Sequence, residues 1–205
     1  MKLLAFTDTH LNKTALNRIK AKSLKYKPEL LICCGDISIF GSGLEKAAKF
    51  INNLNTKTLI IPGNHESPEE IKEICSKYKN LINLHRGVYE YKNFLFFGWG
   101  TGGFSFIEEE FEKIAKQFKK SYDKNKKIIF ITHAPIYNTK LDDLPMGHRG
   151  CKSTRKFIED TAPILTLCGH FHENFKKQDK IKKTLIINPG PDGMLIEIGT
   201  NNNKK

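Results

Sequence analysis

The sequence predicts an α/β fold in a single domain. Short apolar runs typical of buried strands alternate with segments of helical spacing along the first half of the chain. The length of 205 residues is enough for one α/β domain with a substantial core, and it leaves no room for a large cap domain. We expect residues 1–199 to form this domain and the Asn- and Lys-rich residues 200–205 to be a disordered tail.

The first half of the chain has the pattern of repeated βα units. Apolar strands are expected at residues 3–6, 30–34 and 59–61. Amphipathic helices are expected at residues 13–25 and 43–54. A third helix is expected to begin after Ser67, because serine is a favourable N-cap residue and Pro68 suits the first helical turn.

The pattern changes after residue 82. Two short strands, 88–91 and 94–97, are joined by Lys92-Asn93, which predicts a hairpin and an antiparallel addition to the sheet. Further helices are expected at residues 108–122 and near 153–160, with a strand at 128–131 and a long loop at 134–150 between them. The last strands are expected at residues 164–168, 184–187 and 194–198.

Polar clusters follow five of the predicted strands. They are Asp8-Thr9-His10, Gly35-Asp36, Gly63-Asn64-His65-Glu66, Thr132-His133 and Gly169-His170-Phe171-His172. One such cluster alone is usually a turn or an isolated histidine. The carboxyl ends of the strands in an open α/β sheet form the crevice where ligands bind, so clusters in this position are expected to converge on one site.

The clusters supply imidazole nitrogens and side-chain oxygens, a mixture that suits Mn, Fe, Zn, Ni or Co better than Ca or Cu(I). The candidate ligands are Asp8, His10, Asp36, Asn64, His133, His170 and His172. This set exceeds what one tetrahedral ion needs, so two divalent transition-metal ions are expected, with manganese favoured. If Asp36 bridges them, each ion receives a full set of protein ligands.

Two such ions would define the chemistry of the site. Their charge exceeds that of the ligating carboxylates, and the surplus attracts a phosphate ester. They also acidify a bound water to a hydroxide nucleophile and hold the attacking and phosphoryl oxygens for in-line displacement. No Gly-x-Ser-x-Gly elbow, P-loop or dinucleotide-binding motif competes with this interpretation. The residues therefore predict metal-dependent hydrolysis of phosphate esters, with phosphodiesters favoured.

In their order along the chain, the motifs Asp-x-His, Gly-Asp, Gly-Asn-His-Glu, His and Gly-His-x-His resemble those of the calcineurin-like metallophosphoesterase superfamily. The resemblance spans residues 3 to about 191 and points to a small, uncapped member. It implies a four-layer αββα sandwich with two mixed β-sheets and a binuclear metal centre. It also implies that one ion is held by Asp8, His10, Asp36 and His172, and the other by Asp36, Asn64, His133 and His170.

The same resemblance assigns roles to residues that do not bind metal. His65 would donate a hydrogen bond to the phosphate or the leaving group, with Glu66 orienting it. His148 and Arg149 lie in a segment that looks similar to one in small family members, and either would contact the substrate phosphate; a plain loop is the alternative. The aromatic loop at 98–104 would wall the cleft, unless it only closes an edge of the core.

Charge and cysteine content bear on partners and location. The net charge of +12 suits a polyanionic partner, but the lysines are spread over many segments without a nucleic-acid-binding motif, so solvated faces are favoured. Five cysteines without a Cys-x-x-Cys pair argue against a disulfide framework and fit a reducing cytoplasm. No stretch approaches the roughly 20 apolar residues that cross a membrane, so we expect a cytoplasmic protein without a membrane partner.

Three functions are compatible with these features. The leading one is a phosphodiesterase or phosphatase that acts on small phosphate esters in an open cleft. The second is a nuclease acting on DNA or RNA, which the basic charge favours and the lack of sequence for a DNA-binding domain opposes. The third is an interaction scaffold that binds metal with little catalysis, which the complete ligand set opposes. No feature of the sequence predicts an oligomeric state.

Overall fold

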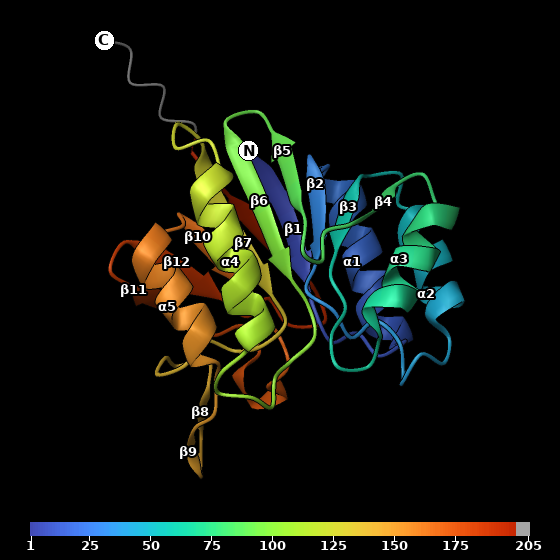
Figure 1. The fold of residues 1–205 in the computed structure, drawn as a ribbon. Helices are drawn as coiled ribbons and strands as arrows, with labels where there is room; N and C mark the ends of the chain where they lie inside the picture. The colour runs from blue at the N-terminus through green and yellow to red at the C-terminus, as the bar shows by residue number, and fades with distance from the viewer. Residues whose placement is uncertain (200–205) are drawn as a thin grey trace.

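Two mixed β-sheets lie face to face at the centre of the protein, in a computed structural model that describes residues 1–199 (Figure 1). The first has the order β13-β1-β2-β3-β4, with β13 at Met194–Glu197, β1 at Lys2–Phe6, β2 at Leu30–Cys33, β3 at Thr58–Ile60 and β4 at Leu81–Asn83. The second has the order β11-β12-β10-β7-β6-β5, with β11 at Gln178–Ile181, β12 at Thr184–Ile187, β10 at Leu165–Leu167, β7 at Lys127–Thr132, β6 at Phe94–Trp99 and β5 at Val88–Tyr91. Neighbouring strands pair in parallel except for β13, β5 and β11, which add antiparallel edges.

Five α-helices cover the outer faces of the sheets within residues 1–199. Helices α1 (Lys13–Tyr26), α2 (Leu44–Asn52) and α3 (Pro68–Lys77) pack against the first sheet. Helices α4 (Glu109–Ser121) and α5 (Lys152–Thr161) pack against the second. The predicted four-layer αββα sandwich is therefore confirmed.

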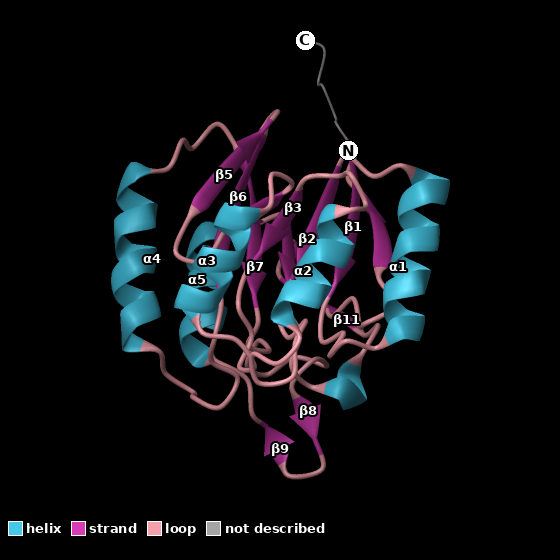
Figure 2. Cartoon of the chain, turned by 90° about the vertical axis from the view of Figure 1, so that its right-hand side faces the viewer, coloured by secondary structure: helices cyan, strands magenta, loops and turns pink. Residues whose placement is uncertain are grey.

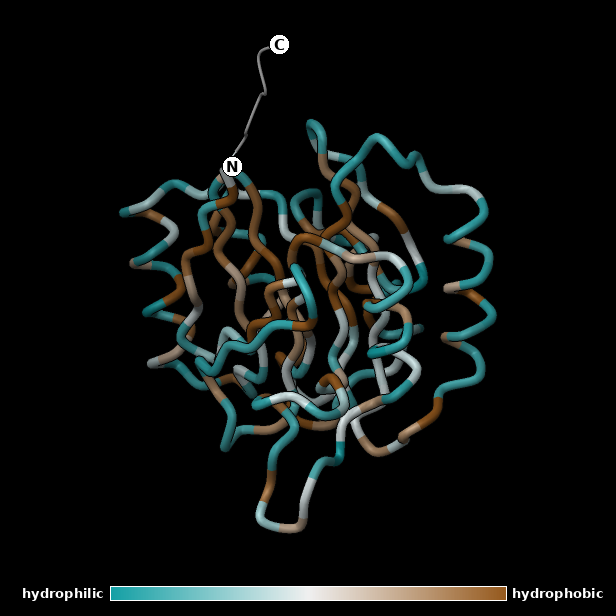
Figure 3. The backbone as a smooth tube through the Cα atoms, turned by 90° about the vertical axis from the view of Figure 1, so that its left-hand side faces the viewer, coloured by the Kyte–Doolittle hydropathy of each residue, from teal (hydrophilic) through white to brown (hydrophobic). Residues whose placement is uncertain are grey.

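This layering divides the apolar residues into three cores. The central core fills the space between the sheets, where Leu3 and Ile32 of one sheet share a cluster with Phe96 and Ile131 of the other. The outer cores join each sheet to its helices. Most strands are thus buried on both faces, which explains why they occur as continuous apolar runs. Figure 3 shows the hydrophobic segments concentrated in these strands.

The predicted helices and strands agree with the structure to within a few residues, and the strands that the prediction lacks are short or polar. Strand β4, strand β11 and a hairpin of β8 (Asp143–Leu144) and β9 (Gly147–His148) are absent from the prediction. Only Ile181 of β11 is buried, and the strand exists because it pairs with β12 at the edge of the sheet. The β8–β9 hairpin lies within the loop expected at 134–150. Strand β11 and the hairpin strands are polar and depend on long-range pairing, so they have no local apolar pattern. Strand β4 is apolar at Leu81 and Ile82, but it is only three residues long.

The carboxyl ends of the parallel strands meet at one end of the sandwich. His133, after β7, has its Nδ1 only 2.8 Å from the carbonyl oxygen of Cys34, after β2, so loops of both sheets meet there. Figure 2 shows these loops gathered at that end, with the β8–β9 hairpin projecting beyond them. The tail expected at residues 200–205 lies outside the described residues. None of the described helices is long and apolar enough to cross a membrane.

Candidate metal centre

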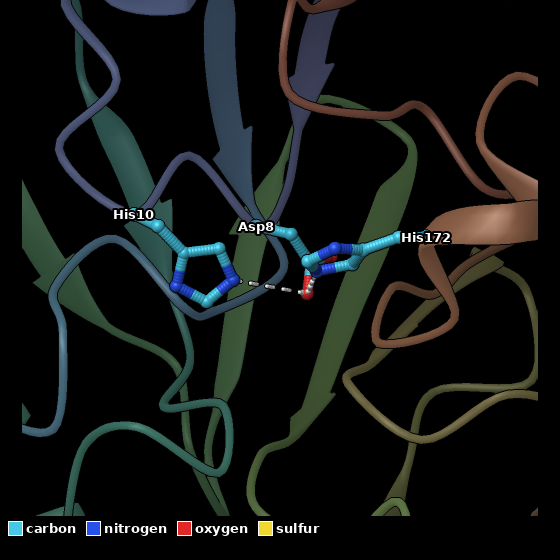
Figure 4. Close-up of side chains that lie close together, drawn as sticks. All are labelled: Asp8, His10 and His172. Atoms are coloured by element: carbon cyan, nitrogen blue, oxygen red, sulfur yellow. Dashed lines mark ion pairs between the residues drawn. The ribbon is translucent and has the colours of Figure 1, made fainter.

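Asp8 and His10 lie in the loop that follows β1. Asp8 is only 3 % exposed, and the two residues have positive φ angles of 50° and 41°, which are uncommon outside glycine and cluster at functional sites. Asp8 Oδ1 lies 4.0 Å from His10 Nε2 and 3.6 Å from His172 Nε2 (Figure 4). His172 begins a short 3-10 helix, η1 (His172–Asn174), so side chains from opposite ends of the sequence face one another.

The two oxygens of Asp8 have different environments. Oδ2 accepts hydrogen bonds from the Thr7 hydroxyl at 2.6 Å and from the His170 backbone N–H at 3.0 Å. Oδ1 is buried and has no hydrogen-bond partner among the described residues. A buried carboxylate oxygen without a partner is costly, so the position of Oδ1 beside two imidazoles fits a bound cation.

Asp8 and His172 shift each other's pKa. Burial raises the pKa of Asp8, but the His172 imidazole and other neighbouring groups outweigh burial and hold this pKa below its usual value. The Asp8 carboxylate in turn raises the pKa of His172. A proton on His172 competes with a metal ion for its Nε2 lone pair, so metal binding beside Asp8 is expected to strengthen as the pH rises.

Asp36 follows β2 and lies within reach of two groups of ligand atoms. Its Oδ1 accepts a hydrogen bond from the His65 backbone N–H at 2.9 Å. Its Oδ2 lies 3.9 Å from His10 Nε2 and 3.5 Å from His133 Nε2. One oxygen of Asp36 therefore faces both the group formed by Asp8, His10 and His172 and the group that contains His133.

Asn64, His133 and His170 form the second group, after strands β3, β7 and β10. Asn64 Oδ1 lies 3.1 Å from His133 Nε2 and 2.8 Å from His170 Nδ1. Burial, followed by the charge of His133, lowers the pKa of His170 to about 4. The His170 ring is therefore neutral at pH 7 and retains a lone pair for a metal ion. This group draws its atoms from both sheets.

Backbone carbonyls orient two of the histidines. His133 Nδ1 donates to the Cys34 carbonyl at 2.8 Å, and His10 Nδ1 donates to the Ser38 carbonyl at 3.1 Å. Because a carbonyl only accepts, each Nδ1 carries a hydrogen, and each ring turns its Nε2 toward the centre. His133 Nε2 then faces Asn64 Oδ1, which is favourable only with a proton or a metal ion between the two atoms.

Glycine is required at two positions beside these residues. A Cβ atom at Gly63 would lie 1.9 Å from Asp36 Oδ1, and one at Gly169 would lie 2.1 Å from Thr7 Oγ1. Both distances are far shorter than a van der Waals contact. The glycines of Gly63-Asn64 and Gly169-His170 therefore let two loops pass directly against the buried acids and their hydrogen-bond partners.

His65 lies beside the same centre with a different hydrogen-bond pattern. Its Nδ1 accepts a hydrogen bond from the Phe40 backbone N–H at 3.2 Å, so the neutral ring carries its hydrogen on Nε2. That Nε2 lies 3.9 Å from Asp36 Oδ2. By distance alone, His65 could complete a ligand group with His10 and Asp36. A protonated Nε2, however, donates a hydrogen bond and has no lone pair for a metal ion.

The hydrogen bonds of Glu66 differ from those expected of a residue that orients His65. Its buried carboxylate accepts hydrogen bonds of 2.7–3.1 Å from the backbone N–H groups of Asp36, Ser38 and Gly63 and from the Ser38 hydroxyl. No described hydrogen bond joins Glu66 to the His65 ring. Since its partners belong to the loops after β2 and β3, Glu66 holds the Asp36 loop against the Gly63 loop.

A surface cavity of about 750 Å³ opens onto the centre. Its lining includes His10, Asp36, Asn64, His65, His170 and His172. Among the described residues, His148 and Arg149 do not line it. Instead, His148 of β9 has its Nδ1 2.8 Å from Oδ1 of the buried Asp142, which directly precedes β8. Arg149 directly follows β9 and also lies outside the lining. The structure thus brings together the metal-ligand candidates and His65, but not His148 and Arg149.

Apolar side chains also line this cavity. Ile39 and Phe40 follow the Asp36 cluster and are not among the predicted site residues, and Phe104 comes from the loop expected to wall the cleft. Ile39 and Phe40 do have a sequence signal, since they belong to no helical or alternating pattern and stand directly before Gly41-Ser42-Gly43. Apolar residues in a turn beside a ligand cluster are candidates for substrate contact.

Comparisons with known proteins agree with this fold. The family profile described as calcineurin-like phosphoesterase matches residues 1–174. The uncharacterised protein MJ1162 of Methanocaldococcus jannaschii is 32 % identical over 96 % of this chain and 91 % of its own length. A probable glycerophosphodiester phosphodiesterase, GpdQ, of Arcobacter nitrofigilis is 28 % identical over 82 % of this chain and 66 % of its own length. The DNA double-strand break repair protein Mre11 of Nanoarchaeum equitans is 29 % identical over 90 % of this chain and 56 % of its own length.

The matched regions differ in what they imply. The chain spans just under two thirds of GpdQ and little more than half of Mre11. The structure of TT1561 of Thermus thermophilus matches with a TM-score of 0.74 at 15 % identity, over 93 % of this chain and 90 % of the TT1561 chain. At this identity the match shows a shared fold alone. The family match includes every candidate ligand up to His172, and it supports a metal-binding phosphoric ester hydrolase in general. The chain belongs to the calcineurin-like phosphoesterase family.

Proposed function

We propose that this protein is a phosphoesterase that uses two divalent metal ions and favours phosphodiesters. Asp8, His10, Asp36 and His172 would hold one ion, and Asp36, Asn64, His133 and His170 the other. The observation that carries this proposal is the position of Asp36 Oδ2, 3.9 Å from His10 Nε2 and 3.5 Å from His133 Nε2. A carboxylate oxygen within reach of both ligand groups is what a shared ligand requires.

The donor set fits hard or borderline dications. It combines oxygens of Asp and Asn with imidazole nitrogens of His and contains no thiolate. When bound, a pair of such ions supplies positive charge for the phosphate and makes a water nucleophilic near neutral pH. Manganese is our first choice for the physiological metal, because carboxylate and amide oxygens contribute three of the seven proposed ligands.

The protein's own residues would then position and protonate the ester. Hydrolysis joins a hydroxyl group to phosphorus and breaks one phosphorus–oxygen bond, and the departing oxygen takes up a proton. His65 is placed to give that proton or to stabilise the developing charge, since its Nδ1 accepts from Phe40 and its Nε2–H is left to donate. Glu66 acts indirectly, because it fixes the loop of Asp36.

Preference for diesters follows from access and charge. The centre opens onto a cavity of about 750 Å³ at the surface, which has room for a substituent on each side of the phosphate. A mono-anionic diester also needs less compensating positive charge than a dianionic monoester. The relative named as a probable glycerophosphodiester phosphodiesterase supports the same class of substrate.

The test is hydrolysis by protein loaded separately with Mn, Ni or Zn, with metal content measured by elemental analysis. Matched substrates are p-nitrophenyl phosphate, bis-p-nitrophenyl phosphate and cyclic nucleotides. We expect close to two metal ions per chain and a higher kcat/KM on the diester than on the monoester. A higher kcat/KM on the monoester at matched pH and metal would contradict the diester preference, and metal binding without any turnover would favour an interaction scaffold.

A nuclease is the second candidate, supported by the net charge of +12 and by the similarity to Mre11. Polynucleotide binding through many phosphate contacts releases counterions and weakens steeply with salt. A steep salt dependence together with cleavage of DNA or RNA would favour this candidate over a small substrate. A cytoplasmic location is part of the main proposal, and the five cysteines, all free and buried, are compatible with it.

A further inference from the structure

Two exposed phenylalanines border the cavity at the metal centre. Phe40 is 77 % exposed and Phe104 is 79 % exposed, and both line the cavity together with His65 and His170. Ile39 beside Phe40 is 48 % exposed. Large apolar side chains that gather around a polar centre, rather than lying singly over the surface, mark a binding surface.

Phe40 is held against His65. Its ring is stacked on the His65 ring, with a centroid distance of 4.0 Å and an interplanar angle of 23°. Its own backbone N–H donates to His65 Nδ1 at 3.2 Å, and its φ of 48° places it in the left-handed region. A strained backbone residue that presents an exposed ring beside the proposed proton donor is suited to contact the leaving group.

Phe104 is held against His170, in the other ligand group. Its ring meets the His170 ring edge-on, with a centroid distance of 4.8 Å and an interplanar angle of 89°. The loop passes so close that a Cβ atom at Gly103 would lie 2.8 Å from His170 Nε2. A hydrogen bond of 2.8 Å from the Thr101 N–H to the Pro62 carbonyl ties the same loop to the strand exit before Asn64. Phe104 is therefore presented from a fixed loop.

We infer that Phe40 and Phe104 are two separate platforms for the organic substituents of a phosphodiester, with Phe40 contacting the leaving group and Phe104 contacting a planar aromatic group on the side that stays with phosphorus. This inference rests on the proposed function and names its substrate class. The two rings contact different histidines of one cavity. A phosphodiester bound between these histidines would have one substituent directed toward each ring. Open ring faces bind flat aromatic groups, including nucleobases, by stacking.

The experiment uses diesters that share p-nitrophenolate as the leaving group and carry methyl, cyclohexyl, phenyl or thymidine 5′-yl as the retained group. The common leaving group keeps the departing chemistry nearly constant, so the ratio of kcat/KM values reports contact with the retained group. In the metal-loaded protein we expect phenyl and thymidylyl to exceed methyl by about 10-fold or more, as base–aromatic stacking allows, and cyclohexyl to fall below phenyl. The thymidylyl-to-phenyl ratio distinguishes a nucleotide from a simple aryl ester.

The variants separate the two platforms. Phe104→Ala should reduce the phenyl-to-methyl ratio toward one, whereas Phe40→Ala should lower kcat/KM by a similar factor for all the diesters and preserve that ratio. Leu24→Ala is the control, because Leu24 is 67 % exposed on α1 and does not line the cavity. Metal content and circular dichroism of each variant check that the centre and the fold are retained.

Three results would overturn the inference and leave the proposed function standing. Equal kcat/KM values for the four retained groups would show an active phosphoesterase without an aromatic platform. Equal values for cyclohexyl and phenyl would show an apolar contact that does not select planar groups. A Phe104→Ala variant that keeps the phenyl-to-methyl ratio of the parent would assign the selection to other residues. Absence of hydrolysis for every ester by the metal-loaded protein would instead overturn the proposed function, and the inference with it.

Discussion

At the residue scale, Asp36 faces several of the other candidate ligands at once. Its Oδ2 faces the candidate ligands His10 and His133. The same carboxylate also faces the His65 ring, and its Oδ1 accepts the His65 N–H. Asp36→Asn keeps the shape but removes the charge shared by both proposed ions. We expect metal stoichiometry and kcat to fall together, with activity lost by more than the roughly 10–100-fold typical of residues that only orient a ligand.

Elemental analysis and steady-state kinetics on the same preparations test this prediction. Asp123→Asn is the matched control, because Asp123 lies after α4 and does not line the cavity. An Asp36→Asn variant that binds two metal ions with parental affinity and turns over normally would show that Asp36 is not the shared ligand.

His65 allows a second prediction, because its hydrogen bond from Phe40 leaves Nε2–H as a donor. His65→Gln keeps approximate volume and a donor but removes the titratable ring, so metal occupancy should persist while kcat falls by about 10²–10⁴. The loss should be smaller on p-nitrophenyl esters than on alkyl or nucleotide esters, whose leaving oxygens need a proton. Equal losses on both would make His65 a group that stabilises charge rather than an acid. Loss of a metal ion would make it a ligand.

His85 belongs to none of the five polar clusters that follow strands. The structure partly buries it, and its Nδ1 accepts the Gly100 N–H at 2.9 Å. Burial, followed by the charge of Arg86, lowers the pKa of His85 to about 4. Since the unfolded chain takes up this proton at about pH 6.5, the stability contributed by neutral His85 is present at pH 7 and is lost as the pH falls toward 4.

We expect the free energy of unfolding to depend less on pH in His85→Gln than in the parent. The glutamine amide oxygen can still accept a hydrogen bond from the Gly100 N–H. Urea unfolding of metal-free protein at pH 7 and pH 5 measures it. Between pH 7 and pH 5, the free energy of unfolding should fall by about 1 kcal/mol less in the variant than in the parent. This value is smaller than the full pKa shift implies, because solvent partly screens the half-buried ring. Identical losses in parent and variant would show that His85 does not titrate with unfolding.

At the element scale, helix α3 starts directly after the Gly63–Glu66 cluster, so the residues that cap this helix lie next to the site. Ser67 and Glu70 form a capping box, in which the Ser67 hydroxyl accepts the Glu70 N–H at 3.1 Å and the Glu70 carboxylate accepts the Ser67 N–H at 2.8 Å. Ser67→Ala should lower the free energy of unfolding by about 1 kcal/mol. Ser76→Ala, in the last turn of α3, should change it by less than about 0.5 kcal/mol.

Chemical denaturation of both variants measures this difference. The metal stoichiometry of Ser67→Ala should equal that of the parent, because Glu66 and Asp36 make their hydrogen bonds independently of the cap. If the two serine variants lose equal stability, the capping box does not stabilise α3 in solution.

At the scale of the whole molecule, the proposed ligands join the two sheets. Asp8, His10, Asp36 and Asn64 follow strands of the first sheet, and His133, His170 and His172 follow strands of the second. Metal binding should therefore stabilise the folded chain as a unit. At a free metal concentration about 100 times the Kd, the expected gain is about 2.7 kcal/mol.

Thermal unfolding with manganese and with a chelator tests this expectation, and we propose that residues 1–199 unfold in one transition. In the Asp36→Asn variant the gain from manganese should shrink. A metal-independent Tm in the parent would contradict a centre that links the sheets, and two separate transitions would contradict the single domain.

The amino-acid sequence by itself predicts the buried strands, the five helices and the candidate ligands, because each depends on local patterns. Strands buried on both faces appear as continuous apolar runs, and the helices have amphipathic spacing and, before α3, a capping signal. The ligand clusters follow strand ends directly. Family resemblance supplies the order of the layers.

Only the tertiary structure decides which distant groups meet. Glu66 contacts the loop of Asp36, 30 residues away in sequence, rather than the ring of its neighbour His65. The edge strand β11 needs pairing with β12, and the hairpin that pairs His148 with Asp142 keeps His148 and Arg149 out of the cavity lining. Such contacts depend on long-range packing and on the direction of each side chain, and neither property is encoded in a local pattern of residue types. The sequence therefore determined which residues are candidates for the site, and the fold decided which of these candidates face the cavity.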